Sequence, residues 1–263
     1  MPLEYFLYIP LGIFAGFMAG LFGIGGGLII VPALAAIFSY LGFDHSVIMH
    51  LAIGTSLATI IFTSLSSVWA HNKKGAVLWD VVARLAVGIM VGATAAGLIA
   101  HLIPTKGLQW FFAFFEFYVA LQMTFNFKPD PSRQLPRKGG MLGAGTIIGS
   151  LSSFVGIGGG TLTVPFLMWC NTSIHKAIAT SAACGLPIAI AGTVGFIISG
   201  WGETALPTHT LGYIHLPSLL GIVATSILFA PLGAKLAHQL PVKPLKHAFA
   251  GLLFLLAFYM FFK

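Results

Sequence analysis

The hydrophobic positions of this chain form long runs that are separated by short polar connections. Several runs reach the roughly 20 residues that a helix needs to cross the hydrocarbon core of a bilayer. A soluble protein cannot bury so many runs, so the pattern predicts an all-α polytopic membrane protein with about 8–10 membrane segments. The apolar runs cover residues 5–40, 46–70, 85–103, 108–127, 139–170, 177–200, 216–238 and 248–262.

The first apolar run of each half of the chain contains a cluster of glycines. The first cluster covers residues 23–27, and the second covers residues 156–160, which lie 133 positions further on. As one straight helix, residues 5–40 would be about 54 Å long, well beyond the ~30 Å hydrocarbon core. Each half is therefore expected to begin with a glycine-broken helix or a re-entrant hairpin. The positions expected to break these helices are Gly23, Pro32, Gly156 and Pro165.

Further matches between the two halves indicate an internal duplication. Residues 50–56 match residues 175–181 at an offset of 125. Residues 101–106 match residues 238–243 at an offset of 137. Ordered matches with small changes in offset are typical of a repeat.

We expect three parts in the chain. A first transmembrane repeat covers residues 1–127, a basic cytoplasmic linker covers residues 128–138, and a second transmembrane repeat covers residues 139–263. The linker has three prolines and four basic residues, a composition that is typical of solvated connections.

The distribution of positive charge favours repeats of inverted topology. A hairpin at the start of each half returns the chain to its starting side, so that each half crosses the membrane an odd number of times. In that arrangement 11 of the 13 Lys and Arg residues lie on one side, whereas a single crossing per first segment gives 8 and 5. Because short cytoplasmic loops concentrate Lys and Arg, we expect two inverted-topology repeats with both termini outside the cytoplasm.

The composition excludes most soluble functions. Apolar residues make up 57% of the chain and charged residues 7%, against roughly a quarter charged in ordinary soluble domains. The net charge of +7 suits lipid headgroups and membrane topology better than a nucleic acid, because the basic residues lie in short connections. Cys170 and Cys184 have no metal-ligand spacing and are expected to stay reduced. No metal or other cofactor is expected, and no Walker-type motif indicates direct use of ATP.

The glycine clusters are the candidate binding site. A helix interrupted inside the bilayer leaves free N–H groups at the start of its second half, where the partial positive charge of the helix end favours an anion. The alternative is close helix packing, as small residues allow in membrane bundles, but adjacent glycines followed by a proline favour a break. The candidate substrate-binding glycines are Gly25, Gly26, Gly27, Gly158, Gly159 and Gly160.

Hydroxyl side chains near the glycines are further candidates for substrate binding. Hydroxyl groups complete the coordination of an anion as hydrogen-bond donors. In membrane helices Ser and Thr also bond their own backbone or a neighbouring helix, so a structural role stays open. The candidate hydroxyls are Thr55, Ser56, Thr161, Thr180 and Ser181.

Three ionisable residues are candidates for proton coupling. His50 and His175 precede the hydroxyls of each half by five residues, and the alternative is that they anchor helix ends at the membrane interface. Glu116 is the only acidic residue inside an apolar segment. A carboxylate in the membrane is costly and marks a functional site by default, although a protonated structural glutamate fits the pattern equally well.

The paired glycine motif resembles that of the TauE/SafE sulfite exporter family. Each copy is followed by Val-Pro, with Ala-Ile-Gly-Thr-Ser or Ala-Ile-Ala-Thr-Ser downstream. The likeness covers essentially the whole chain. It implies a multi-pass transporter of the cell inner membrane for a sulfur-containing anion such as sulfite, sulfoacetate or a related organosulfonate. It also implies that residues 25–27 and 158–160 line the substrate path.

These features predict a secondary active transporter rather than an enzyme. A small anion is expected to bind between the two repeats, with protons as the coupling ion and the lipid bilayer as the surroundings. The alternatives are an uncoupled anion channel built on the same half-helices and a permease for a different small anion. A membrane-embedded enzyme needs converging catalytic groups, and five of the six acidic residues lie outside the apolar segments.

Overall fold

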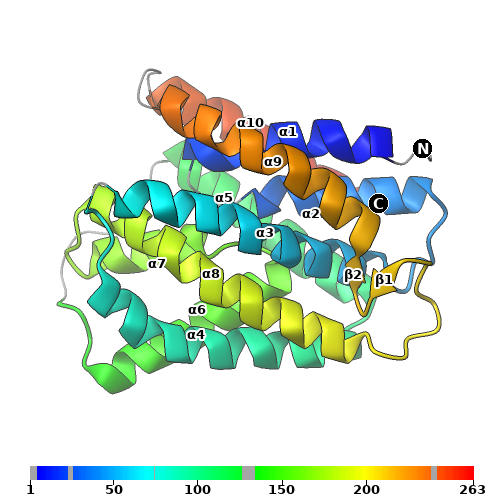
Figure 1. Cartoon of the computed structure of the whole chain (residues 1–263), viewed down its shortest axis with the longest axis horizontal. Helices are drawn as coiled ribbons and strands as arrows, with labels where there is room; N and C mark the ends of the chain where they lie inside the picture. Colours follow the sequence, from blue (N-terminus) through cyan, green and yellow to red (C-terminus); the bar gives the residue numbers. More distant parts are fainter. Residues whose placement is uncertain (1–4, 23–25, 74, 126–133, 238–241) are drawn as a thin grey trace.

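Ten α-helices make up most of the described chain, as the apolar runs predict (Figure 1). The structure is a computed structural model that describes residues 5–22, 26–73, 75–125, 134–237 and 242–263. The first half contains α1 (Tyr5–Phe22), α2 (Gly27–Tyr40), α3 (Ile48–Asn72), α4 (Trp79–Ile99), the 3₁₀-helix η1 (Ala100–Leu102) and α5 (Thr105–Phe125). The second half contains α6 (Lys138–Val155), α7 (Gly160–Trp169), α8 (Ile174–Ser199), β1 (Thr210–Leu211), β2 (Ile214–His215), α9 (Leu216–Ala237) and α10 (Val242–Phe262).

Four helices of the described chain are long and apolar enough to cross a membrane. They are α3, α4, α8 and α9, the third and fourth helices of each half. The helices α2 and α7 are shorter, with 14 and 10 residues. They reach only about 21 and 15 Å, less than the ~30 Å hydrocarbon core. This set of helices indicates a multi-pass membrane protein.

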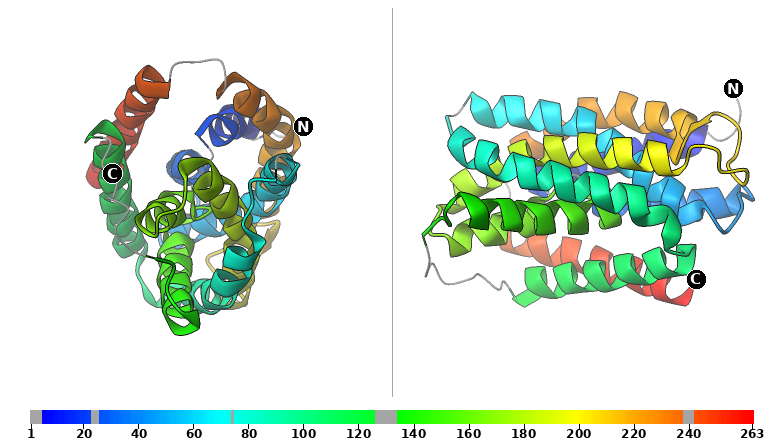
Figure 2. Two further views of the ribbon diagram at one scale, coloured as in Figure 1. Left: turned by 90° about the vertical axis from the view of Figure 1, so that its left-hand side faces the viewer. Right: turned by 90° about the horizontal axis from the view of Figure 1, so that it is seen from below.

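Helices of the first half pack against helices of the second half. We call this exchange of partners between the halves crosswise packing. The first-half helix α1 lies along α9, and the second-half helix α6 lies along α4. Helices α3 and α8 pack against each other, and α5 and α10 form a pair along one side of the bundle (Figure 2). Each of these contacts has a counterpart in which the two halves exchange places. The halves therefore form one body through matching interfaces.

Glycines bring the crosswise helices into close contact. A side chain at Gly92 of α4 would collide with the carbonyl oxygen of Thr146 in α6. A side chain at Gly233 of α9 would collide with the carbonyl oxygen of Phe17 in α1. Small residues allow such close approach of backbones in membrane bundles, so both interfaces depend on glycine.

Helices α3 and α8 run in opposite directions (Figure 1). The ring of His50, near the start of α3, stacks on Tyr213 with 4.9 Å between ring centroids. The same tyrosine lies 6.4 Å from Phe196, near the end of α8. The end of α8 therefore lies at the start of α3. The start of α1 and the end of α10 lie at this end of the bundle too (Figures 1 and 2).

A short antiparallel hairpin of β1 and β2 connects α8 to α9. Its register pairs Thr210 with His215 and Leu211 with Ile214. Residues 212–215 are buried against the helices, so the hairpin closes over the start of α3. It is the one departure from helical structure among the described elements.

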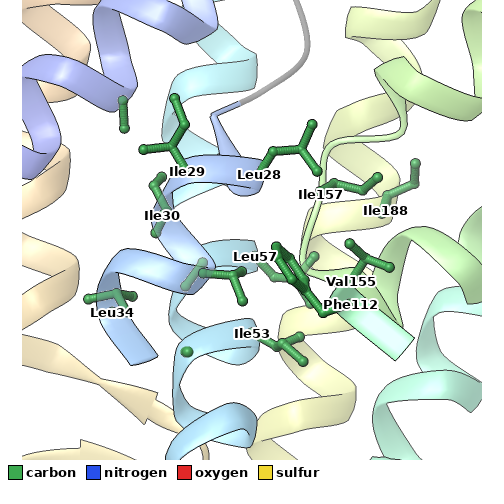
Figure 3. Packing of buried hydrophobic residues seen from close by; sticks show 14 of the residues in the cluster. Leu28, Ile29, Ile30, Leu34, Ile53, Leu57, Phe112, Val155, Ile157 and Ile188 are labelled. Carbon is green, nitrogen blue, oxygen red and sulfur yellow. The ribbon is translucent and has the colours of Figure 1, made fainter. Parts of the chain in front are cut away.

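The short helix α2 lies inside the bundle. Nine of its 14 residues are buried, and Leu28, Ile29, Ile30 and Leu34 belong to the central hydrophobic cluster (Figure 3). Irregular backbone is tolerated at membrane depth only where protein or a wet cavity surrounds it.

Candidate functional site

Both short helices begin at a glycine in the left-handed conformation. Gly26 precedes α2 with φ 68°, and Gly159 precedes α7 with φ 75°. Residues other than glycine seldom adopt such φ values. Neither glycine supplies a capping side chain, so the first N–H groups of α2 and α7 need other partners. Helix α6 also ends at a left-handed glycine, Gly156, with φ 72°. Gly23 and Gly25 lie outside the described residues.

The two prolines expected to break helices lie inside them instead. Pro32 is the sixth residue of α2, and Pro165 is the sixth residue of α7. A proline at this position removes one hydrogen bond, to the carbonyl four residues earlier in the same helix, and the other bonds of these short helices remain. The helices therefore continue through both prolines, and their N-terminal boundaries depend on glycine.

The start of α2 contacts the second glycine cluster. A side chain at Gly27 would collide with the carbonyl oxygen of Gly156, so the two backbones touch. Ser56 of α3 donates a hydrogen bond of 2.8 Å to the same carbonyl oxygen. Leu28 of α2 points toward Ile157 of the second cluster (Figure 3). The N-terminus of α2 and the segment between α6 and α7 thus lie side by side in the core.

Several buried hydroxyl groups of the second half have no hydrogen-bond partner among the described residues. They include those of Ser152, Thr161, Thr163 and Ser181. A Cβ at Gly159 would lie 3.8 Å from Ser152 Oγ and 3.4 Å from Thr163 Oγ1. A buried hydroxyl without a partner costs roughly 1–3 kcal/mol. The second cluster therefore offers unused donors beside the N-terminus of α7.

Sequence reasoning selected Thr161 and Ser181 but missed Ser152 and Thr163. The two missed residues lie about one helical turn from the cluster. Ser152 precedes Gly156 by four positions, and Thr163 follows Gly159 by four. Residues four apart share a helix face. This spacing on both sides of the cluster is the feature of the sequence that could have identified Ser152 and Thr163.

Thr55 and Thr180 join the two halves by matching hydrogen bonds. The Thr55 hydroxyl accepts from the backbone N–H of His215 at 2.9 Å. The Thr180 hydroxyl accepts from the backbone N–H of Leu78 at 3.1 Å. Each threonine thus binds the backbone just before the fourth helix of the opposite half. Both hydroxyls have a structural partner, in contrast to those around Gly159.

The structure does not bring the two candidate histidines together. His50 is buried at the start of α3, where its Nε2 lies 3.1 Å from the carbonyl oxygens of both Ala100 and Ile103. Two acceptors at this distance require that Nε2 carry the donated proton. His175 is exposed at the start of α8. Because α3 and α8 run in opposite directions, these histidines lie at opposite ends of the bundle (Figure 1).

Glu116 of α5 is buried, with 0% of its surface exposed. Neither of its carboxylate oxygens has a hydrogen-bond partner among the described residues. Its repeat counterpart in α10 is the buried, apolar Leu253, so the carboxyl group belongs to one half only. A charged carboxylate in such surroundings is costly unless it is paired. Glu116 therefore stays a candidate for binding a proton.

Comparison with known proteins identifies the family. Residues 8–260 match the family model described as Sulfite exporter TauE/SafE. The chain belongs to this family. A TauE/SafE-like relative from Haemophilus influenzae, named probable membrane transporter protein, is 41% identical over 98% of each chain.

More distant relatives of this TauE/SafE protein carry similar names. A probable membrane transporter protein of Methanocaldococcus jannaschii is 27% identical over 99% of this chain and 98% of that relative. The probable membrane transporter protein YunE of Bacillus subtilis is 28% identical over 75% of this chain and 80% of that relative. No solved structure matches the chain.

The family match confirms the resemblance seen in the paired glycine motif. As a TauE/SafE protein, the chain is a multi-pass membrane transporter rather than an enzyme. The names of the relatives state membrane transport and give no substrate. The chemistry of the interrupted segments must therefore indicate what this TauE/SafE transporter carries.

Proposed function

We propose that this protein is a secondary active transporter of a small sulfur-containing anion across the inner membrane. Sulfite, sulfoacetate and related organosulfonates are the candidate substrates, in line with the description of the family. The observation that carries the proposal is the contact of two interrupted segments in the core, where Gly27 at the start of α2 touches Gly156 at the end of α6. Half-helix N-termini that meet inside the membrane suit an anionic substrate in transporters built from inverted repeats.

The proposed orientation places the start of α1 and the end of α10 outside the cytoplasm. The opposite end of the bundle carries basic side chains, among them Lys73 after α3, Arg137 before α6 and Lys176 at the start of α8. Short cytoplasmic connections concentrate such residues. The crosswise contacts, with α3 and α8 running in opposite directions, support two repeats of inverted topology.

The two threonine hydrogen bonds supply a way to alternate exposure. The bond from His215 to Thr55 lies toward the end that holds the start of α1. The bond from Leu78 to Thr180 lies toward the opposite end. Both bonds are formed together, which we interpret as a conformation closed at both ends. Alternating access then consists of breaking one bond while the other holds.

Protons are the proposed coupling ion, and Glu116 is the proposed carrier. Its buried carboxyl group has no partner among the described residues, so its charge state depends on access to water and to a neighbouring anion. His50 is held between two carbonyl oxygens, and His175 is exposed. Both histidines are weaker candidates for a proton carrier than Glu116.

A substrate panel in proteoliposomes tests the proposed function. Purified protein is reconstituted, and uptake of labelled sulfite, sulfate and short sulfonates is compared with uptake by empty vesicles. We expect saturable uptake of at least one sulfur anion that responds to an imposed pH gradient. Uptake no faster than in empty vesicles for every anion of the panel contradicts the proposal.

A further inference from the structure

The glycines that precede α2 and α7 share a backbone geometry but differ in the side chains around them. Gly26 and Gly159 are repeat counterparts 133 positions apart. Both precede a short helix in the left-handed conformation. A Cβ at Gly26 would lie 3.4 Å from the side chain of Ala19 and 3.6 Å from that of Ile30. The nearest atom to this position is the carbonyl oxygen of Ala15, at 3.3 Å, and the nearest side chains are aliphatic.

The second segment has hydroxyl groups at the same repeat positions. Ser152 and Thr163 lie 133 positions after Ala19 and Ile30, and their oxygens approach the Cβ position of Gly159 at 3.8 and 3.4 Å. Both residues have 0% exposed surface, and neither hydroxyl has a partner among the described residues. A third pair of positions also has an apolar residue in the first half and a hydroxyl in the second, because Leu28 corresponds to Thr161. Among the nearest described neighbours of the two left-handed glycines, hydroxyl side chains occur only at Gly159.

The side chains that contact the second segment carry no positive charge in the described chain. Its immediate neighbours are hydroxyl or aliphatic groups, such as Ser56, Val31 and Ile188. The helix end contributes roughly half an elementary charge. That is enough to favour one negative charge on a ligand, whereas a second charge stays unmatched in a core of low dielectric constant.

We propose that the second interrupted segment alone binds the anion, and that its ligand is a monoanionic oxyanion such as bisulfite or a short alkyl sulfonate. This inference rests on the proposed function and narrows its substrate class. Ser152 and Thr163 donate hydrogen bonds to ligand oxygens beside the first N–H groups of α7. Helix α2 supplies an apolar wall, with Leu28 facing Ile157 (Figure 3). That wall suits an alkyl tail and disfavours a second anionic group, such as the carboxylate of sulfoacetate.

Ile188 covers this site in the observed conformation. A side chain at Gly159 would collide with Cδ1 of Ile188 in α8, so this methyl group fills the space over the glycine. The collision involves the far end of a flexible side chain rather than backbone. Rotation of the Ile188 side chain therefore opens the space for a ligand without moving α7.

Removal of the two hydroxyls tests the inference. The double variant Ser152→Ala, Thr163→Val keeps similar side-chain volumes, and uptake of labelled methanesulfonate into proteoliposomes is measured for it. We expect KM to rise about tenfold for each hydroxyl lost, the effect of a hydrogen bond to a charged group. Thr193→Val is the matched control, because Thr193 also has a buried hydroxyl without a described partner but does not contact Gly159. We expect Thr193→Val to leave KM unchanged.

The outcomes separate this inference from the proposed function. Methanesulfonate uptake by the wild type, with much slower uptake of sulfate and sulfoacetate, supports a monoanion site. An unchanged KM in the double variant, or equal uptake of sulfate and methanesulfonate, overturns the inference and leaves the proposed function standing. Failure of the wild type to transport any sulfur anion removes the proposed function itself. For variants that transport too slowly, a thermal shift that methanesulfonate still induces in detergent also overturns the inference.

Discussion

Gly27 is the residue at which the backbones of the two halves touch. A Cβ there meets the Gly156 carbonyl, a backbone group that cannot rotate away. We expect Gly27→Ala to reduce transport by about tenfold or more, since a clash of this kind typically costs 1–3 kcal/mol. The matched control is Gly251→Ala in α10, where a Cβ meets nothing within 4 Å. Transport and membrane insertion of both variants are compared with those of the wild type. If Gly27→Ala transports as fast as the wild type, the contact between Gly27 and Gly156 has no role in the mechanism.

At the scale of single residues, the sequence shows the glycines but not the polar partners of the site. Gly26 and Gly159 stand out in the sequence because each lies in a cluster of adjacent glycines. Glycine is the residue that adopts the left-handed conformation most readily. Ser152 and Thr163 look like ordinary helix residues, and their role depends on facing the same glycine from two different helices. Thr55 was a candidate for substrate binding in the sequence, whereas in the structure its hydroxyl accepts a hydrogen bond from a backbone N–H 160 positions away.

The β1–β2 hairpin places one ionisable residue in a buried, aromatic environment. The His215 ring lies 5.3 Å from Phe38 and 5.4 Å from Phe43 between centroids. Its Nδ1 lies 2.6 Å from Ser218 Oγ. Burial, together with the electrostatic effect of nearby His209, lowers the pKa of His215 from 6.5 to about 4. The folded hairpin therefore contains neutral His215 at physiological pH.

This shift predicts a pH dependence of stability. Between pH 4 and 6.5 the unfolded chain binds a proton at His215 more readily than the folded chain does. The stabilisation is fully present above pH 6.5 and is lost as the pH falls toward 4. We expect His215→Gln to flatten the dependence of the melting temperature on pH in this window. The control variant His45→Gln, at an exposed position, should keep the pH dependence of the wild type. A wild-type melting temperature that is constant between pH 4 and 6.5 contradicts the prediction.

At the scale of elements, hydrophobic runs locate the helices well because each helix must cover its backbone with apolar side chains in a bilayer. The β1–β2 hairpin was not predicted. Its two-residue strands are too short to show a period of two, and the hairpin falls between two apolar runs. The expectation that Pro32 and Pro165 break helices was wrong, because α2 and α7 continue through both residues.

At the scale of the whole molecule, the proposed inverted repeats predict which loops face the cytoplasm. Cysteines placed singly at the exposed positions Lys73 and Thr208, in a variant without Cys170 and Cys184, report on opposite ends of the bundle. We expect Lys73→Cys to react with an impermeant thiol reagent only from the cytoplasmic face. Thr208→Cys should react only from the outside. Reaction of both cysteines from one face rules out the proposed topology.

The matching threonine bonds predict opposite effects on access to the core. Thr55→Val removes the acceptor for His215 N–H, and Thr180→Val removes the acceptor for Leu78 N–H. With a reporter cysteine at Thr161, we expect Thr55→Val to speed labelling from the end that holds the start of α1. Thr180→Val should speed labelling from the opposite end. Equal labelling from both ends in the two variants contradicts alternating access through these bonds.

The division of the whole molecule into two repeats follows from sequence matches, whereas the crosswise pairing of α1 with α9 and of α4 with α6 does not. Glycines such as Gly92 mark these interfaces only once the partner helix is known. Small residues allow two helices to approach closely, but they do not determine which helix is the partner.

Accumulation of labelled methanesulfonate in proteoliposomes under an imposed pH gradient tests coupled anion transport most directly. Methanesulfonate stays ionised, so a pH gradient alone does not redistribute it. With one proton coupled to each anion, we expect a concentration ratio across the membrane of about ten for each pH unit. Glu116→Gln should abolish this accumulation while leaving exchange of the anion intact. Equal concentrations on both sides at steady state, the behaviour of a channel, would contradict a secondary active transporter.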